Sequence, residues 1–194
     1  MANTIDVLGD DLLSDMIISR NITELIDDVL TSIGLYAFHG CSSLTSVEFP
    51  IVTSINTYAF YGCSSLTSVE FPATTSIGDH AFYGCSSLTT ADFPAVTTIG
   101  GSAFYGCSSL TTIDFPAVTT ISGNAFINCS RLTSVILRNT SQVATLSSTN
   151  AFSGAPNAII YVPDALVNDY KAATNWSTYA DRIKGLSELP EGGE

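Results

Sequence analysis

Carboxylates recur at one position of a repeated sequence, and they are the first candidates for chemistry. Glu48, Glu70, Asp92 and Asp114 each precede a Phe-Pro pair and follow one another at a constant interval. Ser46, Ser68, Thr90 and Thr112 lie two residues before them. In parallel strands, equivalent residues of neighbouring strands stand roughly 4.8 Å apart. The spacing therefore predicts an acidic column, flanked by hydroxyl groups, on an outward face.

The acidic column supports two interpretations. No Lys or Arg lies between Arg20 and Arg131, so we expect no cation within the column. Neighbouring unit charges at that spacing repel by about 1 kcal/mol even in bulk water. Because the aligned carboxylates repel one another, one interpretation is that the column is a ligand-binding face for a basic partner or a cation such as Ca²⁺. Alternatively, the column only keeps an exposed sheet soluble, because charge runs are usually solvated faces.

A second candidate column consists of tyrosines. Tyr61, Tyr83 and Tyr105 recur at the same interval as the carboxylates, and His39 and Ile127 occupy the same phase. Each follows a Phe that is expected to be buried, so we expect the rings to project outward. Stacked exposed tyrosines would offer a rigid contact surface for a ligand. Alternatively, each ring packs on its neighbour and shields the core.

The cysteines and histidines predict neither a metal site nor a catalytic site. Cys41, Cys63, Cys85, Cys107 and Cys129 form a column with no C-x-x-C pair, and a column cannot surround Zn²⁺ tetrahedrally. Stacked neighbours could reach disulfide distance, but five is odd and the column alternates with core positions, which favours buried free thiols. His39 and His80 occupy different phases, without a Ser or Cys nucleophile constellation, and we expect His80 to be solvated. We therefore predict no enzyme, no cofactor and no metal.

Composition excludes several classes of partner. The chain has 194 residues, is 45% hydrophobic and carries a net charge of -12. An acidic chain with a cation-free middle is unsuited to nucleic acids. No apolar run reaches the roughly 20 residues that span a bilayer, so we expect no membrane insertion. The N-terminus lacks a basic region and a long apolar run, which predicts no signal peptide in this chain.

The strict period of these columns predicts a solenoid of stacked units around them. Within a unit, Leu66-x-x-Val69-x-Phe71 predicts a short parallel strand, which the following Pro72 ends. A second short extended segment contains Ile77, and the next unit is entered through a tight 3₁₀-like turn. One face of each strand and one side of each turn are expected to line the core.

The ends of the chain depart from the repeat. Residues 1–21 are predicted to be an N-terminal cap segment with a short helix, and residues 22–157 the solenoid, which begins in register near Ile22. Residues 158–187 are predicted to be a C-terminal strand and helical cap, with Ile159 to Val162 as the final strand. Trp176 and Tyr179 would close that end. Residues 188–194 are predicted to be a disordered tail.

The repeat resembles a known family. Leu44-x-x-Val47-x-Phe49-Pro50, with Ile55, Ala59-Phe60 and Cys63, is similar to the 22-residue BspA-like class of bacterial leucine-rich repeats. The resemblance covers roughly Ile22 to Phe152, and the ending YVPDALVNDYKAATNWSTYADRI is similar to this family's C-terminal cap. It implies a leucine-rich-repeat solenoid of short parallel strands, turns and 3₁₀ segments.

The resemblance also implies a function. Members of the family are mostly surface or secreted binding proteins, some of them adhesins, and similar arrays occur near prophage genes. The implied function is a non-enzymatic, adhesin-like domain for a protein or glycan ligand, at the cell surface or secreted. The alternative is a structural or receptor-binding component of a phage-derived assembly. Oligomeric state is left open.

Overall fold

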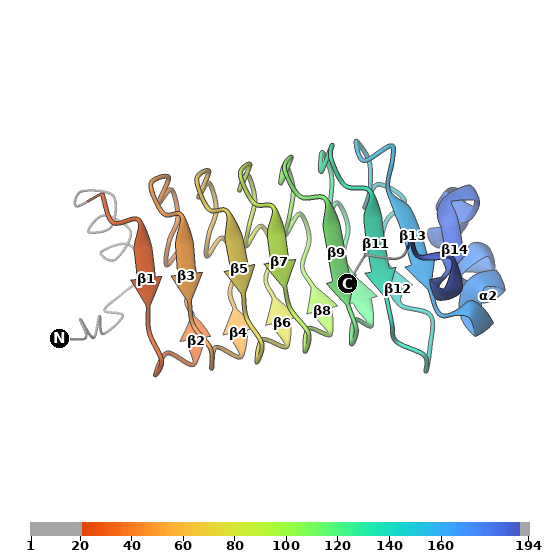
Figure 1. Ribbon diagram of the computed structural model, residues 1–194, viewed down its shortest axis with the longest axis horizontal. Helices are drawn as coiled ribbons and strands as arrows, with labels where there is room; N and C mark the ends of the chain where they lie inside the picture. Colours follow the sequence, from red (N-terminus) through yellow and green to blue (C-terminus); the bar gives the residue numbers. More distant parts are fainter. Residues whose placement is uncertain (1–20, 191–194) are drawn as a thin grey trace.

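The computed structural model describes residues 21–190, and they form a stack of similar turns (Figure 1). Each repeat contributes one strand to each of two parallel sheets. The eight-stranded sheet contains β1 (Glu24–Ile26), β3 (Ser46–Glu48), β5 (Ser68–Glu70), β7 (Thr90–Asp92), β9 (Thr112–Phe115), β11 (Ser134–Leu137), β13 (Ile159–Val162) and β14 (Ile183–Gly185). The six-stranded sheet contains β2 (Ser32–Ile33), β4 (Ser54–Ile55), β6 (Ser76–Ile77), β8 (Thr98–Ile99), β10 (Thr120–Ile121) and β12 (Thr145–Leu146).

The register follows the sequence repeat. Glu48 pairs with Glu70, and Ile55 pairs with Ile77 in the other sheet. Leu25 pairs with Val47 and Ile26 with Glu48, so the strand of the first, divergent unit has the predicted alignment with the next repeat. The predicted solenoid with two short extended segments per repeat is therefore confirmed.

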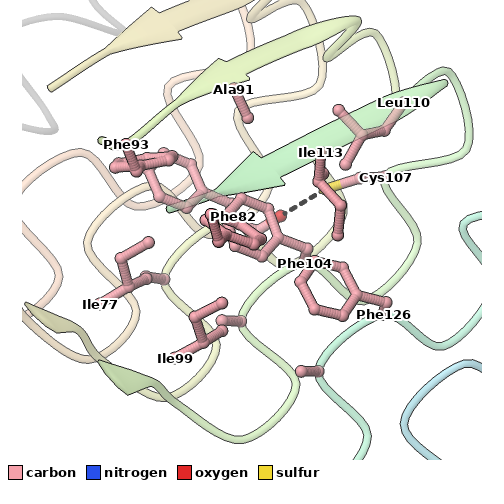
Figure 2. Close-up of a cluster of buried hydrophobic side chains, with 14 of the residues drawn as sticks. Ile77, Phe82, Ala91, Phe93, Ile99, Phe104, Cys107, Leu110, Ile113 and Phe126 are labelled. Atoms are coloured by element: carbon pink, nitrogen blue, oxygen red, sulfur yellow. Dashed lines mark hydrogen bonds between the residues drawn. The ribbon is translucent and has the colours of Figure 1, made fainter. Parts of the chain in front are cut away.

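Columns of apolar side chains fill the space between the two sheets (Figure 2). The rings of Phe82 and Phe104 stack with centroids 5.2 Å apart, and Phe104 stacks on Phe126 at 5.3 Å. Phe93 meets Phe82 edge-on at 5.8 Å. Each turn therefore packs mainly against the turn before it and the turn after it, as expected of a solenoid.

A tight turn joins the two sheets in each repeat. In one repeat, the Cys63 N–H donates to the Phe60 carbonyl at 3.2 Å, and the Leu66 N–H donates to the Cys63 carbonyl at 3.1 Å. Both bonds span three residues, which is the 3₁₀ pattern. Gly62 has φ +72°, a conformation that costs glycine little. The predicted 3₁₀-like turn is confirmed.

The five cysteines are buried and free, as predicted. Each thiol from Cys63 onward donates to a Phe carbonyl of the preceding turn. For example, Cys85 Sγ lies 3.2 Å from the Phe60 carbonyl oxygen, and Cys107 Sγ lies 3.2 Å from that of Phe82. Burial raises the pKa of Cys85 to about 12. The cysteine column is therefore part of the hydrogen bonding between turns.

The C-terminal end is closed by short helices: η1 (Asp164–Leu166), α2 (Val167–Ala172), η2 (Trp176–Arg182) and η3 (Leu186–Glu188). Trp176 Nε1 donates to the Ala144 carbonyl at 2.6 Å, and Asn175 Nδ2 donates to the Leu146 carbonyl at 2.7 Å. The Tyr170 hydroxyl accepts a bond from the Ala144 N–H at 3.0 Å. These side chains hydrogen-bond to backbone groups at the free edge of β12, and the aromatic rings among them cover the core.

Two details of the ends differ from the predictions. β13 is not the last strand, because β14 pairs with it in parallel and places Ile183 beside Ile160. Glu188, expected in a disordered tail, belongs to η3, and Leu189 is half-buried. Residues 1–20 of the predicted N-terminal cap segment (1–21) and the last four residues of the predicted tail lie outside the described residues. Within residues 21–190, no helix is long and apolar enough to cross a membrane.

Candidate recognition surfaces

The acidic row lies on the outer face of the eight-stranded sheet. Val47 and Phe49 point into the core, and the exposed Glu48 between them points outward. Parallel register then aligns the remaining carboxylates, pairing Glu48 with Glu70, Glu70 with Asp92 and Asp92 with Asp114. The predicted alignment of carboxylates is therefore present. A ligand role for them stays a prediction.

The hydroxyl column lies beside the acidic row. Ser46 is half-buried, whereas Ser68, Thr90 and Thr112 are exposed. A neighbouring threonine column fixes the strands that carry them. The Thr67 hydroxyl donates to the Thr45 carbonyl at 3.1 Å, and the Thr89 hydroxyl donates to the Thr67 carbonyl at 2.9 Å. These inter-turn bonds hold the outward side chains in a regular array.

The prediction that no cation stands within the acidic column is wrong at one end. Arg138 Nη2 lies 2.7 Å from Asp114 Oδ2, and Arg138 Nε donates to the same carboxylate at 2.8 and 3.1 Å. Arg138 follows β11, the next strand of the sheet, so its long side chain reaches back to the neighbouring β9. Asp114 is thereby neutralised, whereas Glu48, Glu70 and Asp92 form no ion pair within residues 21–190.

A groove of about 390 Å³ lies at the N-terminal end of this face. Its polar lining includes the carboxylates Glu24, Glu48 and Glu70, and its apolar lining includes Ile26 and Pro50. The side chain of Ile26 is 68% exposed. Sequence reasoning missed Glu24 and Ile26, because the first repeat is divergent. The signal was the register itself, which places Ile26 in the same row as Glu48.

The face is closed at its C-terminal end by the chain itself. The outward positions after Asp114 hold Ile136 and Tyr161, which are 0% and 6% exposed. η3 packs against β13, the strand that carries Tyr161. At the next position, Lys184 Nζ lies 3.8 Å from Glu188 Oε2. The open acidic part of the face therefore spans β1 to β7.

The tyrosine column forms a continuous stack of rings. His39 lies 4.9 Å from Tyr61, Tyr61 lies 4.7 Å from Tyr83, and Tyr83 lies 4.5 Å from Tyr105, measured between ring centroids. The tyrosine rings are half-buried, so they pack on one another as the alternative interpretation proposed. Asn128 Nδ2 donates to the Tyr105 hydroxyl at 3.1 Å. Burial, and then the neighbouring Tyr105 and Tyr61, raise the pKa of Tyr83.

A second aromatic column, missed in the sequence, runs beside the first. Tyr36 stacks on Tyr58 at 4.9 Å, and Tyr58 stacks on His80 at 4.8 Å. These three residues have φ between 56° and 60°. The expectation that His80 is solvated is wrong: its ring is half-buried, and Nδ1 is buried with no hydrogen-bond partner among the described residues. Stacking on Tyr58 removes that side of the ring from water.

Between residues 21 and 190, no group of three or more His, Cys, Asp or Glu side chains is arranged to hold a metal ion. The carboxylates of the acidic row lie in a line on an open sheet. They do not converge on one point.

Comparisons with known proteins agree with this architecture. The crystal structure of the leucine-rich repeat protein TpLRR from T. pallidum matches with a TM-score of 0.55 and 28% identity, over 73% of this chain and 65% of that one. That of a leucine-rich repeat protein from Bacteroides ovatus ATCC 8483 matches with a TM-score of 0.56 and 25% identity, over 85% of this chain and 42% of that one. The chain therefore spans less than two thirds of either protein.

A comparison with curated proteins found no match. The model of the BspA type leucine rich repeat region, in contrast, matches six copies over residues 31–159. This range contains strands β2 to β12, the stacked Phe columns and the buried cysteines described above. The chain belongs to the BspA type leucine-rich repeat family.

Proposed function

We propose that this chain is a non-enzymatic, adhesin-like recognition domain that binds a basic segment of another protein on the outer face of β1 to β7. The family is one of protein-interaction repeats, which supports a binding role. The observation that carries the proposal is the row of Glu48, Glu70 and Asp92, to which the described residues supply no ion pair. A partner that brings cations would relieve the repulsion within this row.

The groove beside the row specifies the partner further. Its carboxylates stand next to apolar surface from Ile26, Pro50 and Pro72. A Lys or Arg side chain matches this combination, because its apolar stem can pack while its charged end pairs with a carboxylate. The flanking Ser68 and Thr90 hydroxyls can hydrogen-bond to the partner's polar groups. The site therefore suits an extended basic segment that crosses several strands.

The test is a selection of random peptides, each about a dozen residues long, on the wild-type domain, followed by affinity measurements. We expect the selected peptides to be rich in Lys and Arg and to bind more weakly as salt rises. The triple variant Glu48→Gln, Glu70→Gln, Asp92→Asn should bind them at least about tenfold more weakly, the equivalent of roughly 1.4 kcal/mol.

The matched control changes the net charge by the same amount away from this face. Asp79→Asn, Asp169→Asn and Asp181→Asn alter three exposed carboxylates outside the row, and Asn at position 79 keeps the oxygen that accepts the Gly101 N–H bond. This control variant should retain the wild-type affinity. Selection of acidic or uncharged peptides, or an equal loss in both triple variants, would refute the acidic face as the binding site.

A further inference from the structure

The two aromatic columns form one surface along the turns, which we call the aromatic edge. Its members are Tyr36, Tyr58 and His80 in one column and His39, Tyr61, Tyr83 and Tyr105 in the other. Rings of the two columns also touch: Tyr58 lies 5.7 Å from Tyr61, and His80 lies 5.8 Å from Tyr83, between centroids. The proposed binding of a basic segment uses none of these residues.

Stacking determines what the aromatic edge can present. Within each column the ring planes are nearly parallel, with interplanar angles of 2–19°. Internal rings therefore have both faces covered by neighbours, and their edges and hydroxyl groups remain for contacts. A ligand that stacks on ring faces has little to bind here. A ligand that presents groups at the same spacing, 4.5–4.9 Å, can meet every ring in turn.

Charge also distinguishes this surface from the sheet face. The turn segments 36–43, 58–65, 80–87 and 102–109 carry both columns and contain no Asp, Glu, Lys or Arg, although the exposed Asp79 directly precedes His80. The chain as a whole carries a net charge of -12, so two copies repel each other when their acidic faces approach. Contact through the turns keeps the two acidic rows apart.

Backbone conformation adds an independent observation. Tyr36 and Tyr58 have φ of 60° and 59°, a left-handed conformation that costs a non-glycine residue roughly 1–2 kcal/mol. In a later repeat, Asn124 occupies the equivalent position with φ 63°, and Asn tolerates this conformation well. The aromatic residues at these positions are therefore not required by the turn geometry. They add ring surface at a conformational cost.

We infer that the aromatic edge binds a second copy of this chain, side by side, to form a twofold-symmetric dimer. A second copy necessarily has the same spacing between turns, so the ring edges and hydroxyl groups of the two copies can meet turn by turn along the aromatic edge. A twofold axis uses the same surface on both copies and closes the assembly at two. The acidic faces then remain available for the basic partner.

The dimer should be weak. The aromatic edge extends over four turns, roughly 15–20 Å at about 4.8 Å per turn. A strip of that length buries less than a standard stable interface, so we expect a weak dimer that forms only at high protein concentration. Added salt should strengthen the dimer, because it screens the repulsion between two acidic chains. This salt dependence is opposite to that expected for binding of a basic peptide.

Sedimentation velocity of the whole chain, from about 5 μM to about 1 mM, tests the inference. The wild-type chain should shift from monomer to dimer over this range. The variant Tyr61→Ser, Tyr83→Ser, Tyr105→Ser should raise the dissociation constant at least tenfold, and it is expected to fold because Ser153 occupies the equivalent turn position. The control variant is Thr53→Ser, Thr75→Ser, Thr97→Ser. It changes three exposed residues in the same repeats, directly before the strands of the six-stranded sheet, and should dimerise like wild type.

A second measurement needs no variant. Photo-oxidative dityrosine cross-linking of the wild-type chain should give covalent dimers joined through the tyrosines of the aromatic edge, Tyr36, Tyr58, Tyr61, Tyr83 or Tyr105. A chain that stays monomeric at the highest concentration, a dimer unaffected by the tyrosine substitutions, or cross-links that avoid these tyrosines would overturn the inference. A monomer would leave the aromatic edge to a different occupant.

Discussion

At the scale of single residues, side chains link one turn to the next through hydrogen bonds and ion pairs as well as through packing. Cys107 fills the core and also donates its thiol proton to the Phe82 carbonyl at 3.2 Å. Arg138 likewise links two strands by neutralising Asp114. Both are contacts between successive turns, and they show how each position of the repeat acquires its role from the turn beside it.

Because the thiols are buried, the free energy of unfolding should depend on pH in the alkaline range. Burial raises the pKa of Cys85 and Cys129 to about 12, whereas an unfolded Cys titrates near 8.5–9. Above pH 9 the unfolded chain loses thiol protons that the folded chain keeps. The free energy of unfolding is therefore expected to fall as pH rises from about 9 to 12.

The variant Cys85→Ser isolates one thiol. Serine keeps a donor for the Phe60 carbonyl but does not ionise in this range. Between pH 8 and pH 10.5 the wild-type chain should lose about 2 kcal/mol more stability than the variant, by urea denaturation. Titrations of tyrosines cancel in this difference. An equal loss in both chains would contradict a buried, protonated Cys85.

At the scale of a repeat, the stacked Phe column should confine the effect of a core substitution to the substituted turn and its neighbours. Phe82 packs on Phe60 and Phe104 at 5.1 and 5.2 Å. Phe82→Ala should cost about 3–5 kcal/mol, and amide exchange should increase first in the turns that contain Phe60 and Phe104. Ser86→Ala, an exposed change in the same turn, should stay within about 0.5 kcal/mol. Uniformly faster exchange along the whole chain would contradict a nearest-neighbour stack.

The acidic row should weaken the fold at low salt. Glu70 stands between Glu48 and Asp92, so Glu70→Gln removes two unfavourable pairs. We expect the free energy of unfolding to rise by up to about 1 kcal/mol in dilute buffer and the gain to shrink in about 1 M salt. Asp169→Asn, on α2 outside the row, should give a smaller gain. A gain that is independent of salt would argue against charge repulsion within the row.

The repeat explains which features could be predicted from the sequence. A constant repeat length fixes the register of both sheets, so the Leu, Val, Phe and Cys columns and the outward Glu48 followed directly. The contact between Arg138 and Asp114 lies off the repeat, since it joins residues 24 apart. The second aromatic column could have been found by the same reasoning, because Tyr36, Tyr58 and His80 recur at the same interval. The left-handed backbone at these three positions is what their residue types do not signal.

At the scale of the whole molecule, the basic residues are distributed unevenly along the stack. Every Lys and Arg after residue 21 lies from Arg131 onward, so the part of the solenoid that carries the open acidic row contains none. η3 and β14 close the face at the other end. A basic partner should therefore bind at the N-terminal part of the sheet, in one orientation, and leave the C-terminal cap free.

A charge-swap experiment tests the central claim most directly. The selected basic peptide is titrated into the wild-type domain and into Glu70→Lys, and the titrations are repeated with the same peptide carrying one Lys→Glu change at each position in turn. Our account predicts that Glu70→Lys weakens binding of the basic peptide at least tenfold and that one Lys→Glu peptide restores it, with a coupling energy of about 1 kcal/mol or more. Wild-type affinity in Glu70→Lys, or a loss that no charge-swapped peptide restores, would contradict recognition through the acidic row.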